Sequence, residues 1–199
     1  MTDTPQEGAK ADEAMNRYAE GDDSAFAIVH QAVYDRLFAF LARMSRSPIL
    51  ADDLLQETFL RMHRARGSFV RGARLLPWCY AIARNVCIDH ARQRAVRKER
   101  TVGSDEGEAA FEQPTGPDAD GEQLTMAAEL AEVVERALAK LPHNQREAFV
   151  LLRYEGLSVA DAAAILGTTE GAVKLRAFHA YEALRAVLGS LAPKKRGAS

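Results

Sequence analysis

The stretch SVADAAAILGTTEGAVKLRAF, residues 158–178, restricts the possible folds of this chain more than any other part of it. Ala163 offers the small side chain that two helices need where they cross closely, and Gly167, four residues later, can adopt the left-handed conformation that reverses the chain. Val173 follows six residues after the glycine, where the second helix must return an apolar side chain to the core. The remaining pocket residues are Leu157, Ile165 and Leu166. An ordinary helical hairpin does not need all three landmarks together, so their spacing predicts a helix-turn-helix.

The second helix of this motif carries residues that suit the major groove of DNA. In a helix-turn-helix the face opposite the core enters the groove, and the helix N-terminus lies near the phosphates. The residues expected there are Thr168, Thr169, Gly171, Lys174, Leu175, Phe178 and His179. Arg176 either reads DNA or pairs with an acidic residue of its own domain. The residues expected to continue the core are Tyr181, Leu184 and Leu188.

The rest of the chain is patterned for helices. Leu, Ala, Arg and Glu dominate and runs of Val, Ile and Thr are rare, which favours an all-α protein. Residues 101–123 are rich in Gly, Pro, Asp and Glu, and are typical of a flexible acidic linker between two small helical domains. The segments expected are a polar N-terminal segment 1–20, a first domain 21–100, the linker 101–123, a second domain 124–190 and a basic tail 191–199.

Caps and apolar spacing set the expected helices. They span about 24–44, 48–66, 75–100, 124–140, 142–154, 159–166 and 169–188. Their expected caps are Asp22 or Asp23, Ser47 before Pro48, Ser158, and Thr168 or Thr169. Leu75, Cys79, Ile82 and Val86 are expected inward in the third helix, and Leu130, Val133, Val134, Ala137 and Leu141 in the fourth. Residues 67–74 form a basic loop in which Phe69 is expected to be exposed.

Charge is distributed in blocks. Residues 61–100 carry a net charge of +9, between segments 1–60 at −6 and 101–122 at −7. A solvated helix face normally mixes acids with bases, whereas the basic block holds only the acids Asp89 and Glu99. This density indicates a surface for a polyanion, most often nucleic acid.

Several functional classes lack their signatures. The sequence has no Gly-rich phosphate loop, metal-ligand cluster or nucleophile motif, so we expect no catalytic residue, no metal and no cofactor. Cys79 and Cys87 are interpreted as buried thiols in a reducing cytosol. No run of about 18 apolar residues and no signal peptide are present, so a cytoplasmic protein without membrane insertion is expected.

The segment ADDLLQETFLRMHR, residues 51–64, has an unusual amphipathic pattern. Its acids near the start and its bases near the end suit the helix dipole, which is a sufficient structural explanation. Its apolar residues, however, cover more than one buried stripe needs; they are Leu54, Leu55, Phe59, Leu60 and Met62. A partner surface and a purely structural role both remain open from this pattern.

Four segments together resemble a known family. They are ADDLLQETFLRMHR, PWCYAIARNVCIDHARQR, LPHNQREAFVLLRYEGLSVADAAAILG and EGAVKLRAFHAYEALR. In this order they resemble the extracytoplasmic-function group of the sigma-70 family, bacterial initiation factors with two domains called regions 2 and 4. The resemblance covers about residues 20–100 and 125–188. It implies a non-enzymatic subunit that binds core RNA polymerase, recognises −35 and −10 promoter elements, helps melt the DNA and is held inactive by an anti-sigma factor.

The resemblance also implies roles by position. Contact with the clamp of the largest polymerase subunit falls to Asp53, Leu54, Gln56, Glu57 and Phe59. Contact with −10 DNA falls to Phe69, Arg71, Arg74, Trp78, Tyr80, Arg84, Asn85, Arg92 and Arg94, although core packing is an alternative for Trp78 and Tyr80. Contact with −35 DNA falls to the helix-turn-helix residues above and to Arg176, while region 4 also meets the flap of the second-largest subunit.

This chain departs from the family pattern at the recognition helix. Ala172, Leu175 and His179 stand where the family often has Thr, Ser and Arg, and Ala162 stands where Ile is frequent. The −35 preference is therefore not expected to be the commonest one. An autonomous helix-turn-helix repressor or activator is the alternative function; such proteins usually dimerise, and no coiled-coil heptad run is present.

Overall fold

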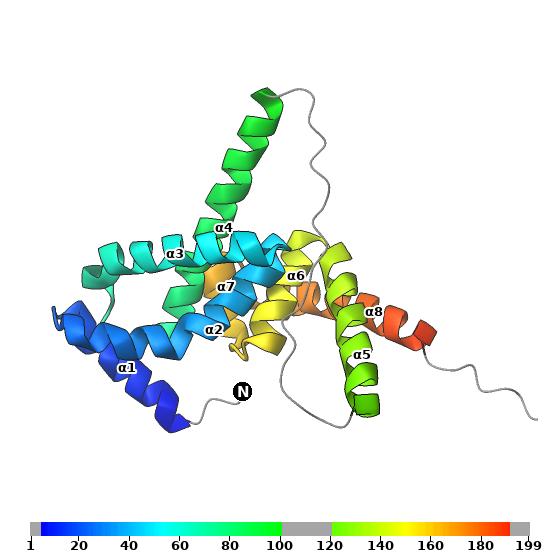
Figure 1. Cartoon of the computed structure of the whole chain (residues 1–199). Helices are drawn as coiled ribbons and strands as arrows, with labels where there is room; N and C mark the ends of the chain where they lie inside the picture. The colour runs from blue at the N-terminus through cyan, green and yellow to red at the C-terminus, as the bar shows by residue number, and fades with distance from the viewer. Residues whose placement is uncertain (1–4, 101–120, 192–199) are drawn as a thin grey trace, which may run out of the picture. The chain divides into compact units, whose positions relative to one another are not determined.

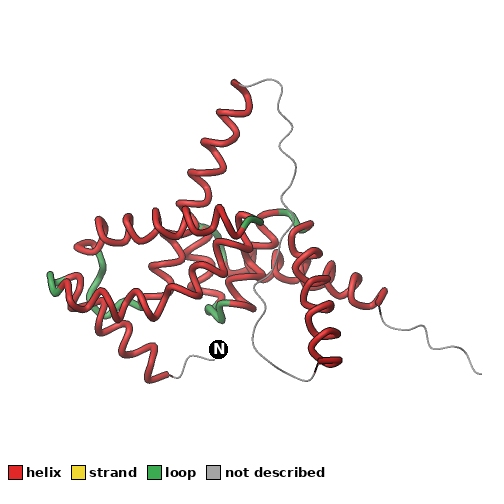
Figure 2. Tube along the Cα trace, viewed as in Figure 1, coloured by secondary structure: helices red, strands yellow, loops and turns green. Residues whose placement is uncertain are grey.

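The computed structural model describes residues 5–100 and 121–191 (Figure 1). These residues form helices joined by short loops, and no strand occurs among them (Figure 2). The chain divides into two compact units, with the helices before residue 101 in one and most of those after residue 120 in the other. The predicted all-α fold class is confirmed. Most of the predicted linker and of the basic tail lies outside the described residues, although residues 121–123 begin a helix.

The first unit is a helical bundle centred on α2. Its elements are α1 (Pro5–Ala19), the short 3₁₀ turn η1 (Asp23–Ala25), α2 (Phe26–Ser45), α3 (Pro48–Ala65), the 3₁₀ turn η2 (Arg66–Ser68) and α4 (Leu75–Arg100). The Asp22 carboxylate accepts a hydrogen bond from the Ser24 amide at 3.1 Å, and the Ser47 hydroxyl accepts one from the Leu50 amide at 3.3 Å. Both caps were predicted, because they depend on neighbouring residues only.

Helix α1 was not predicted. The sequence suggests only a polar segment over 1–20, whereas residues 5–19 form a helix that packs on α2. Ala11, Ala14, Met15 and Tyr18 are buried and recur at helical spacing, so they form a narrow apolar stripe. The Tyr18 ring lies 5.2 Å from the Phe26 ring of α2, centroid to centroid. Two of the four stripe residues are alanines, which makes such a stripe inconspicuous in an otherwise polar segment.

Helix α2 is the most apolar helix of the first unit. By length and composition only, the stretch Asp23–Ser45 meets the criteria for a helix that crosses a membrane. A core helix meets the same criteria, and α2 packs on α1, α3 and α4. Its residues Val29, Val33 and Leu37 are fully buried within the unit. This packing accounts for its apolar character.

The second unit contains the predicted helix-turn-helix. Its elements are α5 (Gly121–Lys140), α6 (His143–Phe149), the π-helical turn η3 (Val150–Tyr154), α7 (Val159–Leu166) and α8 (Glu170–Leu191). Ala163 and Val173 are buried and Gly167 has φ +60, as the three landmarks require. The Ser158 hydroxyl caps α7 by accepting from the Asp161 amide at 3.0 Å, and the Thr169 hydroxyl caps α8 by accepting from the Ala172 amide at 3.2 Å.

The inward face of α5 differs from the predicted one. Leu130, expected to point inward, is 50% exposed, whereas Leu138 is buried. Leu138 lies near the C-terminal end of α5, where Arg146 of α6 donates a hydrogen bond from Nη1 to the Ala139 carbonyl at 3.2 Å. Helix α5 packs against α8, and the sequence of α5 alone does not show which of its apolar side chains face that helix.

Replacing Gly167 with alanine is expected to lower the free energy of unfolding of the full chain by about 1 kcal/mol. A Cβ at this position meets nothing within 4 Å, so the cost comes from the left-handed backbone and not from a clash. Urea denaturation measures the change. Gly189→Ala in α8 is the matched control, because its Cβ also meets open space and alanine favours a right-handed helix. Equal stability of the Gly167→Ala variant and the unmodified chain would contradict the turn geometry.

Candidate nucleic-acid interface

The recognition helix α8 presents a mixed apolar and basic face to solvent. Leu175 is 56% exposed and Phe178 is 57% exposed, although both are large apolar side chains. Lys174 and His179 are exposed beside them, and Gly171 is exposed at the helix start. Val173 is fully buried and fixes the rotation of the helix, so this face points away from the core of its unit. Apolar side chains left in water at the start of such a helix suit contact with bases in a groove.

The burial or the pairing of several other residues of α8 differs from what the sequence predicted. Arg176 is half-buried and forms no ion pair with an acid among the described residues, so pairing inside the domain is not observed there. Leu184 is buried as expected, but Tyr181 is 50% exposed and Leu188 is 37% exposed, which makes their predicted core role wrong. Lys174 lies 3.7 Å from Glu170, and both side chains are exposed, so the pair is weak and exchangeable.

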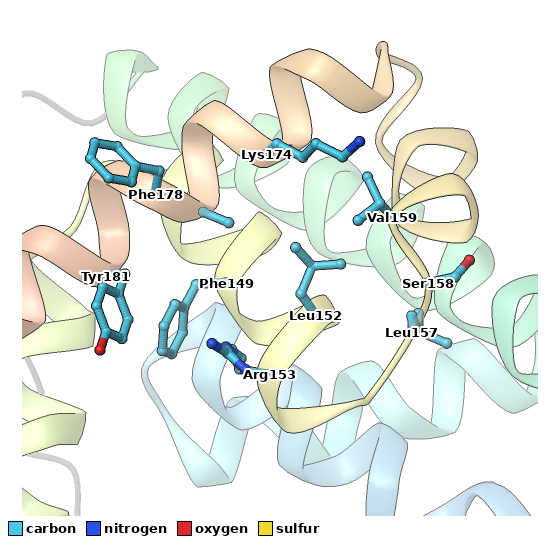
Figure 3. A pocket seen from close by; sticks show the side chains of 10 residues that line it. Phe149, Leu152, Arg153, Leu157, Ser158, Val159, Lys174, Phe178 and Tyr181 are labelled. Atoms are coloured by element: carbon cyan, nitrogen blue, oxygen red, sulfur yellow. The ribbon is translucent and has the colours of Figure 1, made fainter.

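An open groove runs beside the recognition helix. Figure 3 shows Phe149 and Leu152 on one side of it and Phe178 and Tyr181 of α8 on the other, with Lys174 near the Val159 end. Its volume is about 520 Å³, and apolar side chains dominate its lining. The groove explains why Tyr181 remains exposed: the side chain borders an open space where a filled core was predicted.

The basic helix α4 provides a second exposed face. Figure 1 shows its C-terminal part projecting beyond the bundle, and the side chains from Ala91 to Arg97 are exposed. Asn85 and Arg92 are exposed on this helix with the half-buried Asp89 between them. The remaining predicted −10 cations are the exposed Arg71, Arg74 and Arg94 and the half-buried Arg84. A row of cations on a projecting helix suits the backbone of a nucleic acid.

The predicted aromatic residues of the −10 surface are less accessible than expected. Phe69 is 7% exposed and packs edge-to-face on the half-buried Trp78, with ring centroids 5.3 Å apart, so its predicted exposure is wrong. Tyr80 is fully buried against Phe40 at 5.2 Å, so it is a core residue in this structure. The sequence places Phe69 in the basic loop but does not predict its contact with Trp78. Contact of Tyr80 with a base would require the core to open.

The predicted partner surface on α3 separates into exposed and buried parts. Asp53 and Gln56 are exposed, whereas Leu54 is 5% exposed and packs in the core. Phe59 is half-buried and stacks on His30 of α2, with centroids 4.6 Å apart. The apolar residues exposed on α3 are Ile49 and Leu60. The excess of apolar residues noted in the sequence is therefore partly core and partly surface.

Arg61 joins α3 to α4, which sequence reasoning missed. Its Nε donates to Glu57 at 2.7 Å and its Nη1 donates to Asp89 at 2.6 Å. These hydrogen bonds, the one with Asp89 first, raise the pKa of Arg61. The charge of Asp89 is thereby balanced in the middle of the basic face. The Glu57–Arg61 spacing is visible in the sequence, but the partner from α4 is 28 residues away.

No candidate metal centre is found among the described residues. They contain no group of three or more His, Cys, Asp or Glu side chains that could hold a metal ion. Burial raises the pKa of the Cys79 thiol far above its ordinary value, which makes this cysteine a poor nucleophile.

Comparison with known proteins identifies the family of the chain. The family model for Sigma-70 region 2 matches residues 29–97, and the family model for Sigma-70, region 4 matches residues 131–184. The chain belongs to the sigma-70 family. The match to region 2 spans α3 and most of α2 and α4, and the match to region 4 spans α7 and most of α8, which form the helix-turn-helix.

The relatives place this sigma factor in the extracytoplasmic-function (ECF) group. It is 36% identical to RNA polymerase sigma factor CarQ of Myxococcus xanthus over 89% of this chain and 97% of the relative. It is 35% identical to ECF RNA polymerase sigma factor SigF of Caulobacter vibrioides over 92% and 95%. Among solved structures, the sigma factor RpoE in complex with the anti-sigma factor NepR from Bartonella quintana matches with a TM-score of 0.70 and 28% identity, covering 82% of this chain and 96% of that chain.

Proposed function

We propose that this ECF sigma factor binds core RNA polymerase and directs it to promoters by recognising −35 and −10 elements and helping to melt the DNA. The observation that carries the proposal is the presence of both sigma regions in one chain, in order, each with an exposed face suited to its task. The predicted segment boundaries, 1–20, 21–100, 101–123, 124–190 and 191–199, serve as the working division of the chain.

We assign polymerase docking to α3, where the exposed Asp53 and Gln56 contact the clamp together with the half-buried Glu57, and Phe59 contributes at the margin. Glu57 does so while paired with Arg61. Leu54 acts from the core by supporting the helix. Region 4 meets the polymerase flap through the apolar groove between α6 and α8. An open groove with an apolar lining is a suitable seat for an amphipathic element of a partner.

DNA contacts follow the two exposed faces. The −35 element meets α8 through Lys174, Leu175, Phe178 and His179, with Thr168, Thr169, Gly171 and Arg176 at or near the phosphates. The −10 element meets α4 and the loop before it, through Asn85 and Arg92 and the basic residues Arg71, Arg74, Arg84 and Arg94. Phe69 and Trp78 stack on unpaired bases only after their mutual contact opens. Two weak modules on one polymerase strengthen each other by raising their effective concentration.

Regulation and location follow from the family. The solved relative RpoE is bound to an anti-sigma factor, and an anti-sigma factor that covers the polymerase and DNA surfaces is the controller we propose for this chain. The protein is a cytoplasmic, non-enzymatic initiation factor without cofactor, and it is associated with the nucleoid when bound to polymerase.

Run-off transcription with core RNA polymerase tests this function. Adding the purified chain to core polymerase and genomic promoter fragments is expected to produce transcripts with defined start sites. Absence of specific initiation at every promoter would contradict the proposal. A gel shift with the chain alone separates the alternative: an autonomous repressor or activator would bind duplex DNA tightly and specifically without polymerase, whereas this chain is expected to bind it weakly.

A further inference from the structure

One ridge of α1 is bound to the loop that precedes α4. Asp12 and Asn16 of α1 and Glu20, the first residue after this helix, follow one another at intervals of four residues, so they form one ridge along the same side of it. Asp12 accepts a hydrogen bond from the Leu75 amide at 2.8 Å, and Asn16 accepts one from the Gly72 amide at 3.2 Å. Glu20 pairs with Arg71 at 2.8 Å. All three contacts reach the same short segment, which lies more than fifty residues further along the chain.

The contact of Asp12 replaces a cap that α4 lacks. The residue before α4 is Arg74, whose side chain cannot accept a hydrogen bond, and no acid is present in the first turn. The amides at a helix start need an acceptor, and a missing cap costs about 1 kcal/mol. The Asp12 carboxylate supplies this acceptor from another helix, so the start of the basic helix is fixed by α1.

The contact of Asn16 holds the turn inside the loop. Gly72 has φ +81, a conformation that ordinary residues avoid, and its amide points to the Asn16 side-chain carbonyl oxygen. The turn closes its own hydrogen bond from the Ala73 amide to the Val70 carbonyl at 2.9 Å, and Asn16 adds a second one from α1. The shape of the segment from Phe69 to Arg74 depends on this helix as well as on its own residues.

The contact of Glu20 differs in kind. The Arg71 side chain is 81% exposed and Glu20 is 57% exposed, so the ion pair is weak and open to exchange. A DNA phosphate can replace this carboxylate, because it accepts the same two parallel hydrogen bonds from a guanidinium and its binding also releases counterions from the DNA. Glu20 therefore competes with DNA phosphates for the guanidinium of Arg71, which belongs to the basic surface.

We propose that Asp12 and Asn16 of α1, with Glu20 directly after the helix, are positioning residues for promoter opening. Asp12 and Asn16 hold the loop before α4 in the shape that receives an unpaired base, and Glu20 keeps Arg71 occupied until a DNA phosphate replaces it. This inference rests on the proposed role of the loop in −10 recognition. The family description of region 2 matches only from residue 29, so the ridge lies outside the matched segment.

The test uses the holoenzyme on a promoter that the unmodified chain opens, with permanganate reactivity of unpaired thymines as the measure. Asp12→Ala and Asn16→Ala are each expected to reduce the open fraction by about fivefold, the change that loss of one ordinary hydrogen bond produces in an equilibrium. Asp12→Asn keeps an acceptor oxygen and is expected to restore opening. Glu20→Gln is expected to increase opening, most visibly at raised salt, because Arg71 is released for DNA.

Matched variants separate positioning from general stability. Glu13→Ala changes an exposed acid on the same helix away from the ridge and is expected to leave opening unchanged. The affinity of each variant for core polymerase is expected to stay within about twofold of the unmodified chain, since one lost surface contact away from α3 costs little there. If polymerase binding falls in parallel with opening, or if Glu20→Gln lowers opening like the alanine variants, the ridge is only structural and the inference is wrong.

A loop variant distinguishes failure of the inference from failure of the proposed function. Arg71→Ala removes a basic side chain of the loop itself. If Arg71→Ala impairs opening but Asp12→Ala and Asn16→Ala do not, the loop assignment stands and the inference about α1 fails. If Arg71→Ala also leaves opening intact, the −10 role of the loop fails, and the inference fails with it.

Discussion

Replacing both Asp53 and Gln56 with alanine is expected to weaken the affinity for core RNA polymerase by about tenfold or more. Both side chains are exposed on α3, and Gln56 donates only a long hydrogen bond of 3.3 Å to Asp52 within the chain. Their removal therefore costs the first unit little stability, and the effect falls on the partner surface. Titration of labelled core polymerase with the variant measures the dissociation constant.

The matched control for this double variant lies on α2. Gln31 and Asp35 are also exposed and lie four residues apart, close to the three-residue spacing of Asp53 and Gln56, so Gln31→Ala with Asp35→Ala makes the same chemical change on another face. This control is expected to bind polymerase like the unmodified chain. Binding of the Asp53 and Gln56 variant to −35 duplex DNA is expected to be unchanged; an equal loss of polymerase and DNA binding would contradict the docking assignment.

Local rules made much of the fold readable from the sequence. Ser47 caps α3 and Thr169 caps α8 because a side-chain oxygen needs only an amide three residues away. The turn at Gly167 is equally local, since the constraint is on one residue's backbone. Helix ends and the helix-turn-helix were predicted for this reason.

Long-range contacts were not readable in the same way. The bond from Asp12 to Leu75 joins residues 63 apart, and that from Arg61 to Asp89 joins residues 28 apart. In both pairs, the sequence around one residue does not indicate which distant residue it will contact. The burial of Phe69 and Tyr80 depends likewise on Trp78 and Phe40, so the sequence could place these aromatics on the −10 segment but not decide their exposure.

The composition of α4 illustrates the same limit for a functional surface. Its basic charge predicted a nucleic-acid surface, and its cations are indeed accessible along the projecting part. Charge alone did not reveal that Asp89 is balanced by Arg61 from α3 or that Arg71 is paired with Glu20, directly after α1. The packing of the helices decides which acid pairs with each basic side chain. The cations that remain available to DNA can therefore be identified only from the structure.

Replacing Leu175 with alanine is expected to lower −35-dependent transcription by about tenfold at the promoters this factor prefers and to reduce its discrimination at one base position. Leu175 is 56% exposed at the start of α8, where an apolar side chain suits a thymine methyl group and gains nothing from water. The family often has a polar residue here, so we expect Leu175 to contribute to a promoter specificity that differs from that of other members. Transcription from a library with randomised −35 elements measures the change.

Two variants of the same helix show whether the effect is specific to the DNA face. Leu188→Ala makes the same substitution more than three turns further along α8, where the side chain is also exposed, and is expected to leave promoter preference unchanged. Val173→Ala empties a fully buried position and is expected to cost about 2 kcal/mol of stability while keeping the base preference of the folded fraction. If Leu175→Ala lowers transcription equally at all −35 sequences, its side chain supports the helix and does not read the promoter.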